Sequence, residues 1–221
     1  MTGPNDVPTP ARRRDARRNR ELLIEAARAV FTEQGLHAPI DVIARRAGIG
    51  NATLYRHFPT RAALVDAVFH DLLTGTMTAG EEARAVDDAW AGLTGYLETV
   101  FAGLAADRGT NDLMTTHLDG VESLQAVHAH NRRTVELLLG RGRDQGTVRA
   151  DVTPEDVLFA LAALGRTVPA LTSAAGPDAW RRPLTLLLDG LRATPATGPL
   201  PSPVLTAAQL NDTLQGLGPQ N

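Results

Sequence analysis

The stretch that decides the fold is residues 40–58, which read IDVIARRAGIGNATLYRHF. The positions that must be apolar for two short helices to pack at a steep angle are Ile43, Ala47, Ile49 and Leu54. Gly48 lies where the chain must reverse, because a positive φ is cheap only for glycine. The stretch therefore predicts a helix-turn-helix with helices over residues 40–47 and 51–58.

The second of these helices is too short to be stable alone, so its polar face is displayed on a scaffold rather than buried. That face carries Asn51, Thr53, Tyr55, Arg56 and His57. A helix of this kind fits the major groove of DNA, which is about 12 Å wide. Two other interpretations stay open: Tyr55 and Phe58 as core residues, and Asn51 as the N-cap of its helix, alone or while also reading bases.

A resemblance to a known family extends beyond this stretch. Residues 48–69, GIGNATLYRHFPTRAALVDAVF, resemble the DNA-binding signature of the TetR family of transcriptional regulators. The preceding helix also matches the opening of that family, with Ala26, Ala27 and Phe31 followed by Glu33-Gln34-Gly35. The match covers about residues 17–70, and beyond them the chain is similar only in helix number and in the closing LLLDGLR of residues 186–192. The resemblance implies a DNA-binding domain followed by a helical domain for effector binding and dimerisation.

The resemblance also implies roles for individual residues. It assigns phosphate contacts to Thr53, Tyr55, His57 and Arg61. It assigns contacts with base edges to Gly50, Asn51 and Ala52, at the start of the second helix of the motif, which is the recognition helix. Asn51 could hold adenine through two hydrogen bonds, and Arg56 is a second candidate reader. One departure is Ala38-Pro39, which stands where the family usually has a Ser or Thr, so one expected phosphate contact lacks its hydroxyl.

Charge is distributed unevenly along the chain. Residues 1–61 hold eleven Arg against six acidic residues, whereas residues 62–221 hold eleven Arg against nineteen. A basic amino-terminal part on an acidic body suggests one surface for a polyanion. The basic arm consists of Arg12, Arg13, Arg14, Arg17 and Arg18. Alone, such a run is more often a solvated face; beside a helix-turn-helix it suits the DNA backbone or an adjacent minor groove.

Several classes of protein are excluded or disfavoured by composition. The chain has no cysteine, which excludes a disulfide framework, a thiolate zinc site and a cysteine nucleophile. The first residues lack the apolar stretch of a signal peptide, and no window approaches the roughly 20 apolar residues of a membrane span. We therefore expect a cytoplasmic protein without membrane association. His117, His128 and His130 lack the spacing of metal ligands, and no set of catalytic residues converges, so we expect no metal, no cofactor and no enzyme.

Helical periodicity runs along the chain without β alternation, which predicts an all-α fold of about nine helices. We expect residues 1–11 to be a disordered tail, 12–58 the DNA-binding domain and 59–193 the larger helical domain. The first helix is predicted over residues 15–34, with Gly35 as its stop, and Thr60 caps the fourth. Residues 194–221 are predicted to be a mostly loose tail with one turn of helix near residues 207–214.

The later helices are predicted from their periodicity and their caps. They are expected over residues 87–106, 111–118 and 119–140, followed by one that starts at Thr153-Pro154-Glu155-Asp156 and runs to about Val168. Pro169 should kink or end that helix. The last long helix carries Trp180, and Pro183 marks its first turn.

The larger domain offers candidates for an effector pocket and a dimer interface. Candidates for the pocket are Trp90, Phe101, Met114 and His117, although apolar residues at helical spacing are usually core. The resemblance places the dimer interface on the last two helices, where the apolar positions are Val157, Leu161, Leu164, Leu184, Leu187 and Leu191. One recognition helix reads only a few base pairs, so two copies on a two-fold axis are expected.

The most consistent interpretation is a ligand-responsive repressor that binds double-stranded DNA as a homodimer, with a small-molecule effector of unknown identity. An activator, or a regulator that needs no ligand, would carry the same motif. A helical enzyme would need a convergent catalytic set, which the sequence does not offer. A structural dimer without DNA binding is disfavoured by intact Thr53, Tyr55 and His57.

Overall fold

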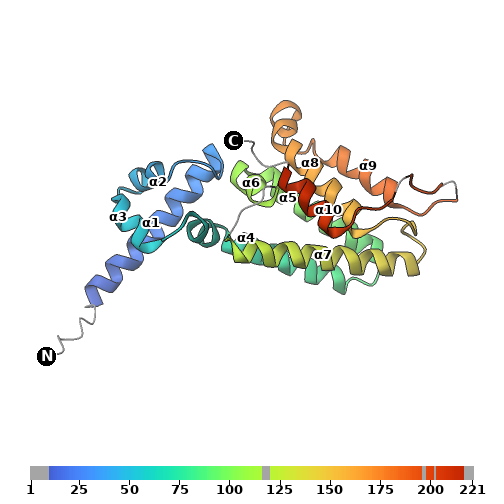
Figure 1. The fold of residues 1–221 in the computed structure, drawn as a ribbon, viewed down its shortest axis with the longest axis horizontal. Helices are drawn as coiled ribbons and strands as arrows, with labels where there is room; N and C mark the ends of the chain where they lie inside the picture. Colours follow the sequence, from blue (N-terminus) through green and yellow to red (C-terminus); the bar gives the residue numbers. More distant parts are fainter. Residues whose placement is uncertain (1–9, 116–119, 196–197, 202, 217–221) are drawn as a thin grey trace.

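The computed structural model describes residues 10–115, 120–195, 198–201 and 203–216. Within these residues the chain is all-helical (Figure 1). The helices are α1 (Pro10–Gln34), α2 (Ile40–Ala47), α3 (Asn51–His57), α4 (Arg61–Ala85), α5 (Ala89–Ala106), α6 (Arg108–Thr115), α7 (Glu122–Asp144), α8 (Pro154–Ala175), α9 (Arg181–Leu191) and α10 (Ala207–Gly216). The all-α fold is confirmed, with ten helices in the described residues rather than about nine.

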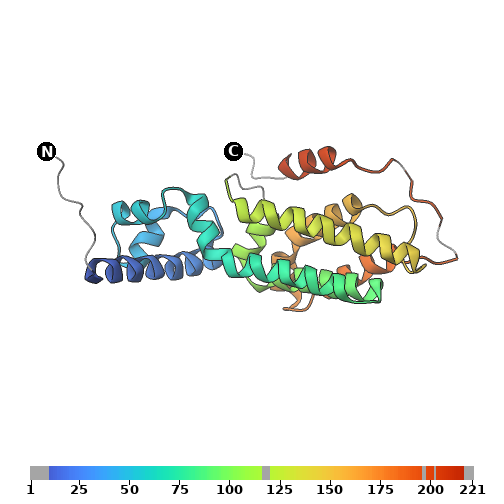
Figure 2. The same cartoon turned by 90° about the horizontal axis from the view of Figure 1, so that it is seen from below.

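The helices form two groups along the length of the molecule. Helices α1–α3 lie at one end, α5 and α7–α10 at the other, and α4 runs from the first group into the second (Figures 1 and 2). The first hydrophobic core is built by α1–α4 and by residues of α6 and α7. The second is built mainly by α5, α7, α8 and α9. Because α4 and α6 contribute to both cores, they connect the two groups mechanically.

The turn of the helix-turn-helix has the predicted geometry. Gly48 ends α2 in the left-handed conformation, with φ 68°, and its N–H donates to the carbonyls of Ala44 and Arg45. A side chain with a Cβ would be strained at this φ, which explains the glycine. Pro39 precedes α2 without any side-chain cap, as expected from the missing hydroxyl.

Other helix starts follow the predicted caps. The Thr60 side chain accepts from the N–H of Ala63 at the start of α4. Thr153 and Asp156 form a capping box at the start of α8, with Pro154 in its first turn. Helix α1 begins at Pro10 rather than near residue 15, so the last two residues of the predicted disordered tail are helical. The rest of that tail, residues 1–9, lies outside the described residues.

Pro169 does not end α8, which continues to Ala175. A proline lacks the N–H that would bond the carbonyl four residues earlier, here that of Gly165. That carbonyl instead accepts from Nδ2 of the buried Asn111 on α6, at 2.7 Å. The same Nδ2 also donates to the carbonyl of Leu104 on α5, at 3.3 Å. Asn111 thus replaces the missing donor and ties α5, α6 and α8 together.

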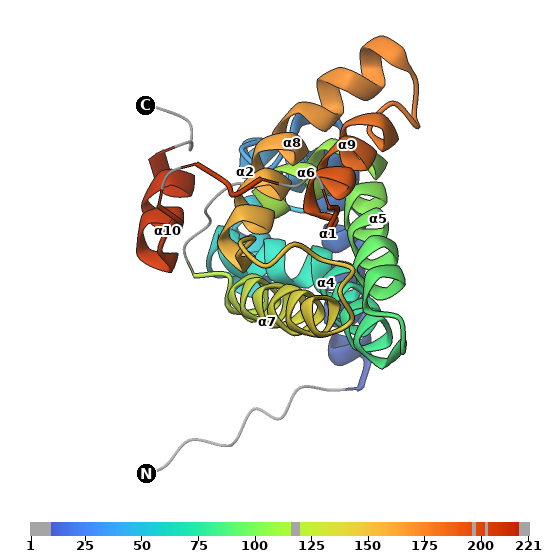
Figure 3. The same cartoon turned by 90° about the vertical axis from the view of Figure 1, so that its right-hand side faces the viewer.

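The carboxyl-terminal segment is more ordered than predicted. Helix α10 has 10 residues instead of one turn, and its Leu210 is buried against the body of the protein. It lies along α8, on the side of the bundle away from α5 (Figure 3). Asp151 holds the segment before it, accepting from the N–H of Leu200 at 2.7 Å and pairing with Arg149. This ion pair and the Leu200 hydrogen bond keep the pKa of Asp151 well below its usual value.

Helix α8 is the one helix in the described residues that is long and apolar enough to cross a membrane. Its best window has a mean hydropathy of 1.5, and only 28% of that window is buried within the protein. The window contains Arg166 and polar residues, so it is not a run of consecutive apolar residues. One such helix is weak evidence for a membrane span. Most of the other positions in this window are half-buried, and the exposed large apolar side chain of α8 is Phe159.

Candidate nucleic-acid interface and effector cavity

Helix α3 is anchored by a few apolar side chains and exposes the rest. Leu54 and Phe58 are buried, which confirms Phe58 as a core residue. Tyr55 is 52% exposed, so its ring is not part of the core. Asn51, Ala52 and Arg56 are exposed, and Gly50 precedes them. The scaffold therefore presents a polar helix face to solvent, as the short length of α3 requires.

Asn51 does not cap α3. The N-cap is Gly50, in an extended conformation, and no side chain caps the helix. Asn51 is the first helical residue, and its amide makes no hydrogen bond within the described part of the chain. Its side chain is thus free to meet an external partner.

His57 is oriented with one ring nitrogen inward. Its Nε2 is buried and has no hydrogen-bond partner in the described residues. Burial lowers the pKa of His57 below 6.5, and the nearby charges of Arg56 and Arg20 lower it further. Of the two ring nitrogens, only Nδ1 is left to reach a phosphate.

Arg61, for which the resemblance implies a phosphate contact, has main-chain partners within the protein. Its Nη2 donates to the carbonyl of Ala38 at 2.7 Å, and its Nη1 donates to the carbonyl of Leu36. Burial lowers the pKa of this guanidinium. Arg61 therefore clamps the start of α4 to the loop between α1 and α2, and its terminal amino groups are occupied by main-chain oxygens.

Many arginines of the described residues have acceptors within the protein, including two on α2. Arg45 pairs with Asp41, and Arg46 with Glu33. In contrast, no carboxylate of the described residues lies within ion-pair distance of four arginines near α3: Arg14, Arg18, Arg20 and Arg56. The exposed Arg17 is 3.7 Å from Glu21, a weak pair. Positive charge at this end of the molecule is thus left largely uncompensated.

Arg20 is a residue of this surface that the sequence analysis missed. Its guanidinium lies over the Phe58 ring, 5.2 Å from the centroid, next to His57. The signal was available, because Arg13, Arg17 and Arg20 follow the i, i+4, i+7 spacing of one helix face.

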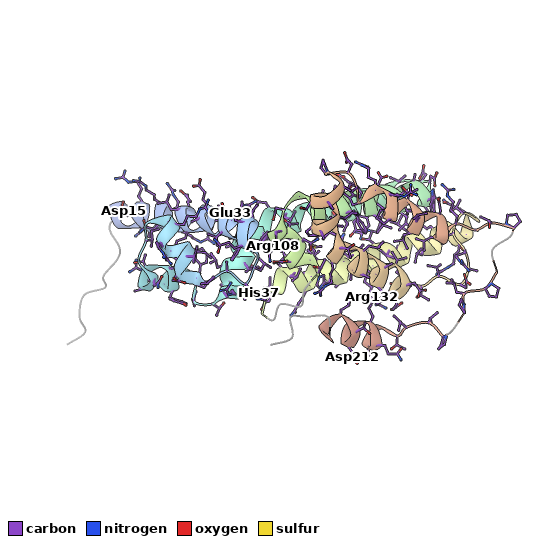
Figure 4. All side chains as sticks on the ribbon, turned by 90° about the horizontal axis from the view of Figure 1, so that it is seen from above. Asp15, Glu33, His37, Arg108, Arg132 and Asp212 are labelled. Carbon is purple, nitrogen blue, oxygen red and sulfur yellow. The ribbon has the colours of Figure 1, made fainter. Side chains whose placement is uncertain are left out.

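The basic arm is a helix rather than an extended chain. Helix α1 starts at Pro10 and is continuous through Asp15 to Glu33, two residues labelled near its ends in Figure 4. A helix with side chains is about 10–12 Å across, whereas the minor groove is about 6 Å wide. Insertion of the arm into a minor groove is therefore sterically disfavoured.

A cavity of about 240 Å³ lies between α4, α5 and α6. Its lining residues are Leu72, Thr76, Ala79, Thr99, Val100, Gly103, Leu104, Thr110 and Met114. Of the predicted pocket residues only Met114 lines it. Phe101 is buried and stacked on Trp180, and Trp90 is covered by the Arg192 guanidinium, so both serve packing. His117 lies outside the described residues.

The cavity shares α6 with the contact to the amino-terminal group. Thr110 and Met114 face the cavity, while Gly109 packs on the main chain of Phe31 in α1. Asp112 accepts from the N–H of Leu36 at 3.1 Å, directly after α1. Arg108, labelled in Figure 4, lies at the same junction. A shift of α6 would therefore be transmitted to α1.

Most of the predicted dimer residues face the interior of their own protomer. Val157, Leu161, Leu184 and Leu191 are buried, and Leu164 and Leu187 are half-buried. Four of the six are therefore unavailable to a second copy. The large apolar side chains that remain exposed on these helices are Phe159 on α8 and Leu186 on α9, the latter 66% exposed. Periodicity identified an apolar face but not which side of the helix it covers.

In the described part of the chain, no three His, Asp or Glu side chains gather as metal ligands. The fold and the exposed basic helix face define a helix-turn-helix DNA-binding protein with a separate helical domain. Residues 23–68 match the family model "Bacterial regulatory proteins, tetR family". Residues 88–193 match "Transcriptional regulator SbtR-like, C-terminal domain". The chain belongs to the TetR family of transcriptional regulators.

Solved structures agree with this assignment. A TetR transcriptional regulator from Streptomyces coelicolor is 28% identical, covering 79% of this chain and 99% of its own, with a TM-score of 0.52. SmeT, the repressor of the Stenotrophomonas maltophilia multidrug efflux pump SmeDEF, is 24% identical over 85% of this chain and 100% of its own, with a TM-score of 0.58. The regulator FadR from Bacillus subtilis in complex with stearoyl-CoA is 18% identical over 77% and 98%, with a TM-score of 0.59. The last two are similar in fold alone.

Proposed function

We propose that this protein is a transcriptional repressor that binds a near-palindromic operator as a homodimer and releases it when a small molecule enters the α4–α6 cavity. The observation that carries the proposal is the set of arginines without carboxylate partners beside the exposed face of α3. The phosphates of duplex DNA would supply the missing partners, and the released counterions would drive binding.

Each exposed residue has a role in this proposal. Asn51 and Arg56 read base edges from the major groove, while Gly50 and Ala52 let the start of α3 approach closely. The residues that hold phosphates are Thr53, Tyr55, His57 through Nδ1, Arg17, Arg18 and Arg20. Phosphate contacts position the domain without reading the base sequence. The specificity for an operator therefore depends on Asn51 and Arg56.

Dimerisation is supported by the free apolar surface of α8 and α9. Phe159 and Leu186 are exposed there, and Leu158, Leu164 and Leu187 are half-buried. A second copy on a two-fold axis would bury this surface in a four-helix bundle. Two recognition helices would then meet half-sites about 34 Å apart, or a multiple of that spacing.

Ligand response is supported by the shared helices. Helices α4 and α6 border the cavity and also pack in the amino-terminal core. A ligand in the cavity therefore changes how the amino-terminal helix group is placed relative to the larger helix group. Induction needs only that the ligand prefer the state that does not fit DNA. A 100-fold preference corresponds to about 2.7 kcal/mol of coupling. In this role the protein works in the cytoplasm, together with the DNA.

The test begins by selecting bound fragments from random duplex DNA. Affinity for the selected operator should fall steeply when salt is raised from about 50 to about 200 mM. Arg18→Gln should weaken binding to all sequences alike and reduce the salt slope by about 1. The matched control is Arg133→Gln, an exposed arginine on α7, which should change neither.

Two outcomes would contradict the proposal. One is a flat salt response, and the other is equal behaviour of the two arginine variants. A reporter gene behind the selected operator then separates repression from activation, because deletion of the regulator raises expression only if it represses.

A further inference from the structure

We infer that the effector is a small, uncharged, mainly apolar molecule that donates a hydrogen bond and has about ten non-hydrogen atoms. The inference rests on the proposed function, since it names the chemistry of the molecule that the α4–α6 cavity takes. It follows from three properties of the lining, namely its charge, its hydrogen-bonding capacity and its size.

No charged side chain of the described residues lines the cavity. Six of the nine lining residues are apolar or glycine, and the other three are Thr76, Thr99 and Thr110. An ionised carboxylate or phosphate moved into such a site would lose its hydration without gaining an ion-pair partner. The cavity therefore disfavours charged occupants of either sign.

The three threonine hydroxyls have already used their protons. Thr76 donates to the carbonyl of Leu72 at 3.0 Å, and Thr99 donates to the carbonyl of Gly95 at 2.9 Å. Thr110 donates to the Asp107 carboxylate, also at 2.9 Å. A hydroxyl has one proton and two lone pairs, so each of these oxygens can still accept. The polar group that the lining satisfies is thus an N–H or O–H donor on the ligand.

The size of the cavity limits the ligand. A cavity of about 150 Å³ lined by apolar side chains holds benzene. The 240 Å³ observed here scales to about ten non-hydrogen atoms, the size of a fused two-ring system. A long acyl chain or a nucleotide-bearing thioester exceeds this volume and, in the second case, carries charge.

Gly103 provides a way to fill the cavity without disturbing the fold. It lines the cavity from α5, and a Cβ built on it would meet no atom within 4 Å. Gly95 lies on the same helix and is equally open, but it does not line the cavity. Gly103→Leu and Gly95→Leu are therefore a matched pair, because both gain the same helix propensity and only the first occupies the ligand space.

The experiment compares indole with one probe that lacks the donor and with one probe that carries a charge. Indole is uncharged and has an N–H donor; indene has the same size but no donor; indole-2-carboxylate keeps the donor and adds a charge. Binding to the full chain is measured by isothermal titration calorimetry in the absence of DNA. We expect indole to bind at least tenfold more tightly than either of the others, and Gly103→Leu to abolish this binding while Gly95→Leu retains it.

Several results would overturn the inference. Equal binding of indene would remove the donor requirement, equal or tighter binding of the carboxylate would remove the exclusion of charge, and retention of binding by Gly103→Leu would place the site elsewhere. Failure of all three probes to bind would also overturn it. Because operator binding is measured separately, binding of indole without any change in DNA affinity would contradict the proposed regulation and leave the ligand chemistry standing.

Discussion

Asn51 and Arg61 show how the fold assigns roles that residue type leaves open. Asn51 could have been a cap, but Gly50 occupies that position and leaves the amide free. The family resemblance implies that Arg61 contacts a DNA phosphate. In the structure its guanidinium donates to the carbonyls of Leu36 and Ala38. The motif indicates which residue stands where. Whether a guanidinium faces DNA or its own chain depends on a loop more than twenty residues away.

Replacing Asn51 tests its proposed contact with a base. Asn51→Ala should relax preference at one position in each half-site by roughly 1–3 kcal/mol, because a bidentate amide contact would be lost. Selection from duplexes randomised around the operator measures this preference. A uniform loss of affinity at every sequence, with selectivity retained, would show that Asn51 does not read a base.

Asn111 is a second residue whose role follows from the structure. Asn111→Ala leaves the Gly165 carbonyl without a donor, because Pro169 supplies no N–H. The free energy of unfolding should fall by about 1–3 kcal/mol, as expected for an unsatisfied buried group. Urea denaturation measures the change, and Asn211→Ala, at an exposed position on α10, is the control. Equal midpoints for the two variants would argue against this account of α8.

At the scale of elements, helix ends were predicted best where one residue acts locally. The Gly48 turn, the Thr60 cap and the Thr153 capping box all lie where their sequences indicate, because each satisfies main-chain groups within a few residues. The continuation of α8 through Pro169 was not predictable in this way. It depends on a side chain of α6, 54 residues distant from the carbonyl that it satisfies.

Helix α6 is the element through which the cavity and the amino-terminal group are most directly joined. A Cβ at Gly109 would lie 3.0 Å from the main-chain carbon and oxygen of Phe31, closer than ordinary contact. Gly109→Ala should therefore displace α6 from α1, lower the free energy of unfolding by about 1–3 kcal/mol and weaken operator binding. Fluorescence anisotropy with labelled operator measures the binding.

Gly95→Ala is the control for this prediction, since its Cβ enters open space on the neighbouring helix α5 and Gly95 does not line the cavity. It should leave operator affinity unchanged. If Gly109→Ala is destabilised but binds the operator with unaltered affinity, the contact between α6 and α1 does not transmit to the DNA-binding surface.

For the whole molecule, the decisive feature is which apolar surface remains uncovered. Helices α8 and α9 bury Leu161, Leu184, Leu188 and Leu191 inside the protomer and keep Phe159 and Leu186 exposed. The periodicity of these helices identifies an apolar face, but it does not tell whether that face packs in the core or against a partner. Only the placement of the neighbouring helices does so.

A charge at Leu186 tests the proposed dimer. Leu186→Glu should weaken self-association by about 3 kcal/mol, because an unpaired carboxylate would be buried between the copies. Sedimentation velocity should then show monomers at micromolar concentration. Leu137→Glu, at a position on α7 that is 38% exposed, should leave the dimer intact. Dissociation of both variants, or of neither, would be inconsistent with an interface at α9.

The sequence by itself determined the all-α fold, the helix-turn-helix and the residues that α3 exposes. These features depend on periodicity, glycine conformation and caps, which act over one or two turns. Tertiary structure alone decided that Arg61 is a clamp and where the cavity and the exposed apolar side chains of α8 and α9 lie. Those properties arise from segments that are distant along the chain and meet only after the helices pack, so no local pattern encodes them.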